Sequence, residues 1–243
     1  STPSTSSCGR SARSAVAMPE MSPPPPTGMS AADLNGDGWP DIAVVATASN
    51  QLYPLRGSGN RGDSGLIAQE VINGLSAPRS VISLDVVGDD RPDLIATAGG
   101  NILFLLENSG AFKFKASALS LNGGGAGFDV ISVASAAMPM LWASADRQVV
   151  PLTGRPPVAA AAAAATRLML SRSATGLAAG DLDGDGKVDL AVGSADSAVF
   201  YSLGGTAARE LPIPPPMGVA QSAPVYVAIA DLNGDGRAEL ISA

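Results

Sequence analysis

The stretch Asp33-Leu-Asn-Gly-Asp-Gly-Trp-Pro-Asp41 decides the fold, because three closely related stretches follow it along the chain. They are Asp85-Val-Val-Gly-Asp-Asp-Arg-Pro-Asp93, Asp181-Leu-Asp-Gly-Asp-Gly-Lys-Val-Asp189 and Asp231-Leu-Asn-Gly-Asp-Gly-Arg-Ala-Glu239. Their first residues are separated by 52, 96 and 50 positions, so the middle gap is close to two periods. The segment from Asp129 to Ser144 has the matching apolar stretches but no acidic loop, and we take it as a further repeat. The chain therefore holds five repeats, the third without its loop.

Each repeat surrounds its acidic loop with the same series of short apolar segments. Those after the loop are rich in β-branched and small residues and are bounded by Gly, Asn and Asp, which is typical of buried strands. They lie at residues 42–47, 94–97, 141–144, 190–193 and 240–242, and third segments follow at 51–55, 101–106, 148–152 and 197–203. Four strands in about 50 residues make one blade of a propeller. The sequence therefore predicts an all-β fold, a β-propeller of four-stranded blades.

The chain divides into a tail or linker and a propeller segment. Residues 1–27 are rich in Ser, Thr and Pro and include the lone Cys8, so no disulfide can form within the chain. Residues 28–243 hold the blades, approximately at 28–75, 76–124, 125–172, 173–221 and 222–243, and the alanines at 159–165 are taken as an insertion. The fifth repeat stops inside its second strand and is incomplete. We expect the natural protein to continue, or another chain to complete the ring.

Composition argues against several classes of function. A formal net charge of −7 and an isoelectric point near 4.5 do not suit a nucleic acid partner. No apolar run reaches the length of a membrane helix. The sequence contains no His, and its one Cys lies in the tail, which removes His-based acid–base chemistry and Cys–His or Ser–His nucleophiles. We therefore do not expect an enzyme.

The acidic loops have the donor pattern of a calcium site. Fourteen of the 22 acidic residues fall within the four loops. Acids recur at positions 1, 3, 5 and 9, with Gly at position 4 and usually at position 6. Calcium takes six to eight oxygen ligands in irregular cages, and it would relieve the repulsion between crowded carboxylates. In the first loop we expect the side chains of Asp33, Asn35, Asp37 and Asp41 and the carbonyl of Trp39 as ligands. An EF-hand would need a Glu at position 12 and flanking helices, and neither is present.

This loop between two short apolar strands, repeating about every 50 residues, resembles the FG-GAP/VCBS family, whose members include integrin α heads and fungal fucose-binding lectins. The resemblance covers about residues 28–243 and implies a calcium ion in the loop that joins the first two strands of a blade. It carries the ligand positions to Asp181, Asp183, Asp185, Lys187 and Asp189, and to Asp231, Asn233, Asp235, Arg237 and Glu239. The second loop departs from the pattern at Val87 and Asp90, so we expect a weaker site at Asp85, Asp89 and Asp93. The third repeat has no acid between residues 132 and 140, and we expect its blade to be held by packing alone.

We interpret the chain as a non-enzymatic, extracellular calcium-binding module that has a structural or adhesive role in a cell-surface or extracellular assembly and binds other proteins. The alternative is a carbohydrate-binding, lectin-like propeller. Extracellular sites of this kind bind calcium at roughly 10⁻⁴ to 10⁻³ M, far above resting cytosolic levels. The tripeptide Arg61-Gly62-Asp63 is interpreted as a solvated turn, and we expect Trp39 and Trp142 to serve in packing.

Overall fold

The computed structural model describes residues 25–59, 65–99, 102–121, 127–133, 140–153, 158–159, 167–194, 198–204, 206–211, 226–235 and 238–242. Outside these ranges lie the tail up to residue 24 with Cys8, the tripeptide at 61–63, residues 160–165 of the alanine run, and Arg237.

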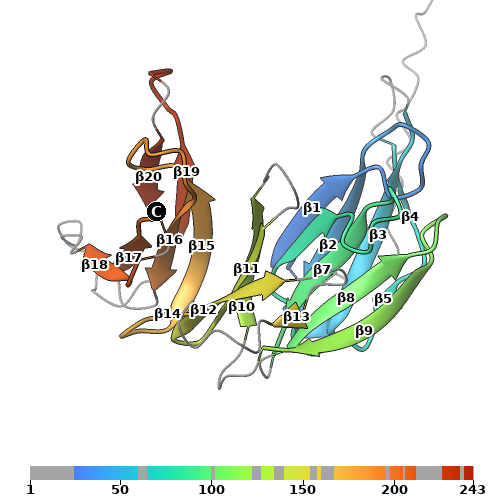
Figure 1. The fold of residues 1–243 in the computed structure, drawn as a ribbon. Coiled ribbons are helices and arrows are strands. Elements are labelled where there is room, and N and C mark those ends of the chain that lie inside the picture. Colours follow the sequence, from blue (N-terminus) through green and yellow to red (C-terminus); the bar gives the residue numbers. More distant parts are fainter. Residues whose placement is uncertain are drawn as a thin grey trace, which may run out of the picture.

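The described part of the chain forms five antiparallel sheets in sequence order, and we number these blades 1 to 5 (Figure 1). Blade 1 comprises β1 (Gly28–Ala32), β2 (Asp41–Ala46), β3 (Gln51–Gly57), β4 (Leu66–Ala68) and β5 (Ile72–Asn73), with a single 3-10 turn, η1 (Thr47–Ser49). Blade 2 comprises β6 (Val81–Leu84), β7 (Asp93–Ala98), β8 (Ile102–Asn108) and β9 (Phe114–Ser120). Blade 3 comprises β10 (Gly127–Val133), β11 (Met140–Ala145), β12 (Gln148–Thr153), β13 (Val158–Ala159) and β14 (Leu168–Met169). Blade 4 comprises β15 (Ala174–Gly180), β16 (Asp189–Ser194), β17 (Val199–Ser202) and β18 (Arg209–Leu211), and blade 5 comprises β19 (Val227–Ala230) and β20 (Glu239–Ser242).

Each of the first four blades is a four-stranded meander. In blades 1 and 3 the fourth strand is split, because β4 and β5 both pair with β3, and β13 and β14 both pair with β12. The predicted β-propeller of four-stranded blades, with an incomplete fifth repeat, is confirmed. In blades 1, 2, 4 and 5 the acidic loop connects the first strand to the second, and it lies at the same end of each blade. In blade 3, Val133 and Met140 form the last residue pair before the same connection.

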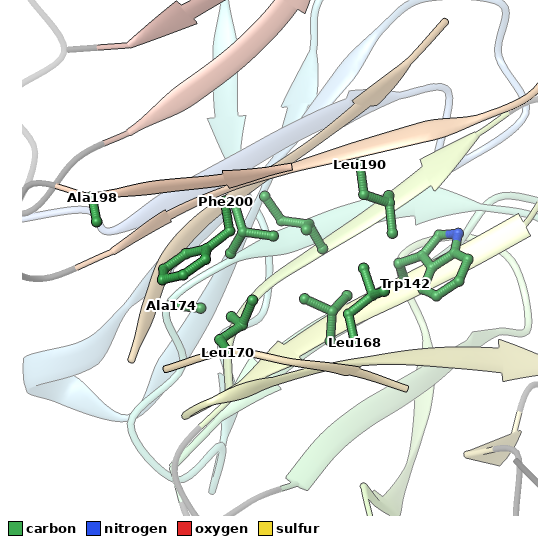
Figure 2. Packing of buried hydrophobic residues seen from close by; sticks show 10 residues of the cluster. Trp142, Leu168, Leu170, Ala174, Leu190, Ala198 and Phe200 are labelled. Atoms are coloured by element: carbon green, nitrogen blue, oxygen red, sulfur yellow. The ribbon is translucent and has the colours of Figure 1, made fainter. Parts of the chain in front are cut away.

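The hydrophobic core lies between successive blades. Strand residues alternate in direction, so each sheet has a rear face toward the preceding blade and a forward face toward the following one. Blades 1 and 2 share one cluster of buried side chains, blades 2 and 3 a second, and blades 3 and 4 a third. Figure 2 shows the third cluster, in which Trp142 and Leu168 of blade 3 face Leu190 and Phe200 of blade 4. Trp142 therefore packs as predicted, whereas Trp39 is 47% exposed.

One expectation about blade 3 is wrong, because hydrogen bonds as well as packing hold it. The carboxylate of Asp129 on β10 accepts a hydrogen bond from Ser80 Oγ of blade 2 at 2.7 Å and another from the backbone N–H of Leu177 of blade 4 at 3.0 Å. The same carboxylate accepts the N–H of Val130 at 2.8 Å. Burial raises the pKa of Asp129 above its ordinary value, although these hydrogen bonds lower it in part. A polar tie therefore joins the blade that lacks an acidic loop to both of its neighbours.

Candidate metal centre

We name the acidic loops after their blades: loop 1 (residues 33–41), loop 2 (85–93), loop 4 (181–189) and loop 5 (231–239). In loops 1 and 4 the glycines at positions 4 and 6 have positive φ angles, 79° and 85° for Gly36 and Gly38, and 80° and 78° for Gly184 and Gly186. Only glycine adopts this backbone without strain. The two glycines in each loop turn the backbone so that the side chains at positions 1, 3 and 5 approach one another.

The carboxylate at position 1 organises the backbone of each loop. Asp33 Oδ1 accepts the N–H groups of Gly36 at 2.7 Å and Asp37 at 3.1 Å, and its Oδ2 accepts that of Gly38 at 2.7 Å. Asp181 repeats this arrangement with the N–H groups of residues 184, 185 and 186 at 2.7, 3.1 and 2.9 Å. The loops are therefore preorganised by their own hydrogen bonds.

The carboxylate at position 9 is buried and ties its loop to the third strand of the blade. Asp41, Asp93 and Asp189 are each 0% exposed. Asp189 Oδ2 accepts the N–H of Leu182 at 2.7 Å, and its Oδ1 accepts the N–H of Gly204, just beyond β17, at 2.7 Å. Asp41 is held in the same way by the N–H groups of residues 34 and 57, and Asp93 by those of residues 86, 87 and 108. Sequence analysis gave these residues only a ligand role, and it missed the ties because the donors are backbone groups.

Loop 4 brings three carboxylates to one point. One oxygen from each of Asp181, Asp183 and Asp189 lies within 4.8 Å of the other two. Oxygens that share a calcium ion at roughly 2.3–2.6 Å can be at most about 5 Å apart. The donor set is wholly oxygen, it includes three negative charges, and two of its members lie at the edge of solvent. This cluster of three acidic residues could bind a metal ion, and its chemistry fits calcium.

The remaining predicted ligands lie beside these groups, and the position 5 carboxylates contact basic side chains. Asp185 accepts Lys187 Nζ at 2.6 Å, and this contact lowers the pKa of Asp185 and raises that of Lys187. Asp37 accepts Arg56 Nη2 at 3.3 Å, and its pKa is lowered chiefly by the N–H of Trp39. Both ion pairs are exposed to solvent and weak, so a divalent cation that binds the carboxylate could replace the basic side chain.

Loop 5 repeats the pattern over its described residues. Asp231 accepts the N–H of Gly234 at 2.7 Å, and Asn233 Oδ1 accepts the N–H of Asp235 at 2.8 Å, as Asn35 does for Asp37 at 2.7 Å. Glu239 Oε2 accepts the N–H of Leu232 at 2.8 Å, so the longer side chain still reaches the second loop residue. Its Oε1 accepts a hydrogen bond from Asn233 Nδ2 at 3.0 Å. The corresponding carboxylate oxygen in the other loops accepts a hydrogen bond from a backbone N–H at the end of the third strand.

Loop 2 differs in charge balance as well as in sequence. Asp90 occupies a position that is glycine in loops 1 and 4, and it holds a left-handed φ of 62° that L-residues adopt only with strain. Arg91 donates to Asp89 Oδ2 from both Nε at 3.1 Å and Nη2 at 2.6 Å, and this contact lowers the pKa of Asp89. Burial raises the pKa of Asp93. A guanidinium thus supplies positive charge in the loop where Val87 removes a ligand.

The family profile described as "FG-GAP-like repeat" matches residues 33–96 and 181–242, which together make just over half of the chain and include all four acidic loops. The chain belongs to the FG-GAP-like repeat family. The unmatched stretch between them contains blade 3, the repeat without an acidic loop, so the FG-GAP match agrees with the repeat assignment from the sequence. FG-GAP propellers are typically protein-interaction modules.

Solved structures share the fold at low sequence identity. A crystal structure of BBS1N in complex with ARL6DN, soaked with lead, superposes with a TM-score of 0.59 at 13% identity, covering 84% of this chain and 59% of that chain. A humanized mutant of the Chaetomium thermophilum Polycomb Repressive Complex 2 gives a TM-score of 0.52 at 14% identity, covering 83% of this chain and 45% of that chain. This chain thus spans less than two thirds of either one, and these likenesses show the propeller fold alone.

A search of curated proteins and a search for membrane-spanning helices both gave negative results for this chain. No curated protein matches its sequence significantly. Within the described residues, no helix is long and apolar enough to cross a membrane.

Proposed function

We propose that this FG-GAP chain is a non-enzymatic, extracellular calcium-binding propeller that acts as a structural or adhesive protein-interaction module in a cell-surface or extracellular assembly. The observation that carries the proposal is the convergence of Asp181, Asp183 and Asp189 within 4.8 Å on a loop preorganised by its own hydrogen bonds. Loops 1 and 5 repeat its backbone arrangement.

The residues that would hold the ion follow from position in the loop. In loop 4 these are Asp181, Asp183, Asp185, Asp189 and the carbonyl of Lys187. In loops 1 and 5 they are Asp33, Asn35, Asp37, Asp41 and the carbonyl of Trp39, and Asp231, Asn233, Asp235, Glu239 and the carbonyl of Arg237. Calcium, when bound, would neutralise the crowded carboxylates and hold each loop rigid at the rim of the propeller. Loop 2, with Arg91 paired to Asp89, would be the weakest of the four.

One observation supports the extracellular location, and another supports protein partners. FG-GAP repeats are commonly extracellular, where millimolar calcium would fill sites of modest affinity. The structural neighbours named above occur in complexes with other proteins, which supports interaction as the use of the fold.

The test is the thermal midpoint of the chain in millimolar calcium and in excess chelator. A site filled at a hundredfold excess over its dissociation constant stabilises the folded state by about 2.7 kcal/mol. We expect a clear fall of the midpoint in chelator, and a smaller fall in an Asp181→Ala variant, which has one site fewer. An equal midpoint in both buffers would contradict calcium binding and, with it, the extracellular assignment. Labelling of intact cells with an antibody against the chain tests that assignment separately.

A lectin-like function is the second candidate, and the exposure of Trp39 favours it. The indole is 47% exposed at the end of loop 1, where a sugar ring could stack on it. Gly59 packs against its edge, since a Cβ there would lie 2.6 Å from Trp39 Nε1. Binding on a glycan array that is lost in a Trp39→Ala variant would support this function, and an array without signal would exclude it for the glycans displayed.

A further inference from the structure

The side-chain amide of Asn108 links two acidic loops that belong to neighbouring blades. Asn108 ends β8 and is 2% exposed. Its Nδ2 donates one hydrogen bond to the carbonyl oxygen of Leu34 in loop 1 at 2.8 Å and another to that of Pro92 in loop 2 at 2.9 Å. Its Oδ1 accepts the N–H of Gly110 at 2.9 Å. Both hydrogens of this buried amide and its oxygen therefore have partners, and the two hydrogens bind loops of different blades.

The position of Asn108 is occupied by glycine in blades 1 and 4. The backbone N–H of Asn108 binds Asp93 Oδ1 at 2.7 Å, and the N–H groups of Gly57 and Gly204 bind the position 9 carboxylates of their own blades in the same way. This contact is made by the backbone alone, so it does not require an Asn side chain. The amide of Asn108 instead makes a contact across blades, to the carbonyl of loop 1.

Leu34, which accepts this hydrogen bond, separates two of the ligands proposed for loop 1, Asp33 and Asn35. Asp41 Oδ2 accepts the N–H of Leu34 at 2.8 Å, and Asn108 donates to its carbonyl oxygen. The peptide groups on both sides of Leu34 are therefore held, one by blade 1 itself and the other by blade 2. The peptide group that Asn108 holds leads directly to Asn35, so Asn108 fixes the backbone from which a proposed ligand projects.

Loops 1 and 2 face each other across a pocket of about 260 Å³. Its lining comes from residues 33–36 of loop 1, residues 90–92 of loop 2 and Gly110. The pocket separates the two loops along this stretch. The amide of Asn108 therefore connects their backbones where their own side chains leave a gap.

We propose that Asn108 is a positioning residue for the calcium site of loop 1, so that this site depends on blade 2 as well as on blade 1. The amide would not touch the ion. It would hold the peptide group between Leu34 and Asn35 in the orientation that the ligands need. Groups that orient metal ligands are worth about 10- to 100-fold in metal affinity. The inference rests on the proposed calcium binding, and it adds a residue that lies outside the acidic loops.

The experiment is a calcium titration of the chain followed by NMR. The amide signals of Gly36 and Gly38 report on loop 1, and those of Gly184 and Gly186 report on loop 4, which Asn108 does not contact. We expect Asn108→Ala to raise the calcium concentration that half-saturates loop 1 about tenfold and to leave that of loop 4 unchanged. Asn108→Gly should have the same effect and keep the fold, because glycine occupies this position in blades 1 and 4.

Asn50→Gly is the matched control for a general loosening between blades 1 and 2. Asn50 Oδ1 accepts the N–H of Ala77 at 2.7 Å, in the turn after β2, at the opposite end of the blade from loop 1. Glycine tolerates the left-handed φ of 57° at this position. The control should leave the calcium affinity of loop 1 unchanged. In excess chelator, the loop 1 amides should exchange hydrogen faster in Asn108→Ala than in the wild type and in the control.

The outcomes separate this inference from the proposed function. Calcium binding that is normal in loop 1 of Asn108→Ala would overturn the role of Asn108 and leave the calcium site standing. So would a loss of affinity that loop 4 or the Asn50→Gly control shares, and so would unchanged hydrogen exchange in chelator. A wild-type chain whose loop amides do not respond to calcium would contradict the proposed function, and this inference would fail with it.

Discussion

Replacing Asp189 by Asn separates the structural role of a position 9 carboxylate from its proposed ligand role. The side chain is 0% exposed and accepts two backbone N–H groups, from Leu182 and Gly204, both at 2.7 Å. An amide keeps one acceptor but turns Nδ2 toward the other N–H, which loses a hydrogen bond to a charged group and leaves a buried donor unsatisfied. These are two aspects of one lost hydrogen bond, which costs about 1–3 kcal/mol and more when the acceptor is charged, so we expect a loss of about 2–3 kcal/mol.

The assay is thermal unfolding in excess chelator, where metal binding cannot contribute. For a chain of this size the expected loss lowers the midpoint by about 5–10 °C. Asp183→Asn is the matched control, because Asp183 is exposed and Asn35 and Asn233 already make its hydrogen bond in loops 1 and 5. We expect the control to change stability by less than about 0.5 kcal/mol. If Asp189→Asn, the wild type and the control unfold at the same temperature in chelator, the two hydrogen bonds of Asp189 do not stabilise the fold, and its structural role is excluded.

Four other substitutions test the packing at loop position 2, a close backbone contact in blade 1 and the polar tie of blade 3. Leu34→Ala should cost about 2–5 kcal/mol, because Leu34 is 1% exposed among Val81 and Leu94 and its loss opens a cavity between blades 1 and 2. Leu232→Ala, at the same position of loop 5, should be nearly neutral because Leu232 is 67% exposed, and equal losses in denaturant titration would contradict the packing of Leu34. Gly57→Ala should cost about 1–3 kcal/mol, since a Cβ there collides with the carbonyl oxygen of Pro40, and a midpoint at the wild-type value would count against that contact. Burial raises the pKa of Asp129 above 3.8, so its contribution to stability is greatest below pH 3.8 and is lost as the pH rises through the raised pKa. The stability of the wild type relative to Asp129→Asn should therefore fall as the pH is raised above 3.8, and a difference that does not change with pH would exclude this linkage.

Much of the fold was predictable because its signals are local and repeated. The Asp-x-Asn/Asp-Gly-Asp-Gly pattern combines turn residues with glycines that adopt positive φ, so it places a loop between two strands wherever it occurs. The 50-residue period then fixes the number of blades, even where blade 3 has lost the pattern. The convergence of Asp181 and Asp183 followed from the same spacing, since both lie on one short loop.

The features that sequence could not supply depend on contacts between distant residues. Asp189 meets the N–H of Gly204 only because β17 returns beside β16, and no residue type marks the donor. Asp129 meets Ser80 and Leu177, which lie 49 and 48 residues away, about one period on each side. Its own surroundings in the sequence contain no second acid or base that would single it out. An isolated acid in a strand becomes informative only after the blades are placed side by side.

Blade 3 shows which contacts can stabilise a blade that has no acidic loop. It has no loop carboxylates, yet it keeps a four-stranded sheet and shares a buried cluster with each neighbour. In blades 1, 2 and 4 the carboxylate at position 9 binds backbone N–H groups, and in blades 1 and 2 the apolar residue at position 2 packs between sheets. Both kinds of contact form without an ion. These contacts therefore stabilise the blades without an ion, and we expect calcium, where it binds, to add rigidity chiefly to the loops at the rim. Chelation should then increase hydrogen exchange in loops 1, 4 and 5 while the paired strands stay protected, and equal loss of protection in blade 3 would show that the ion supports the whole fold.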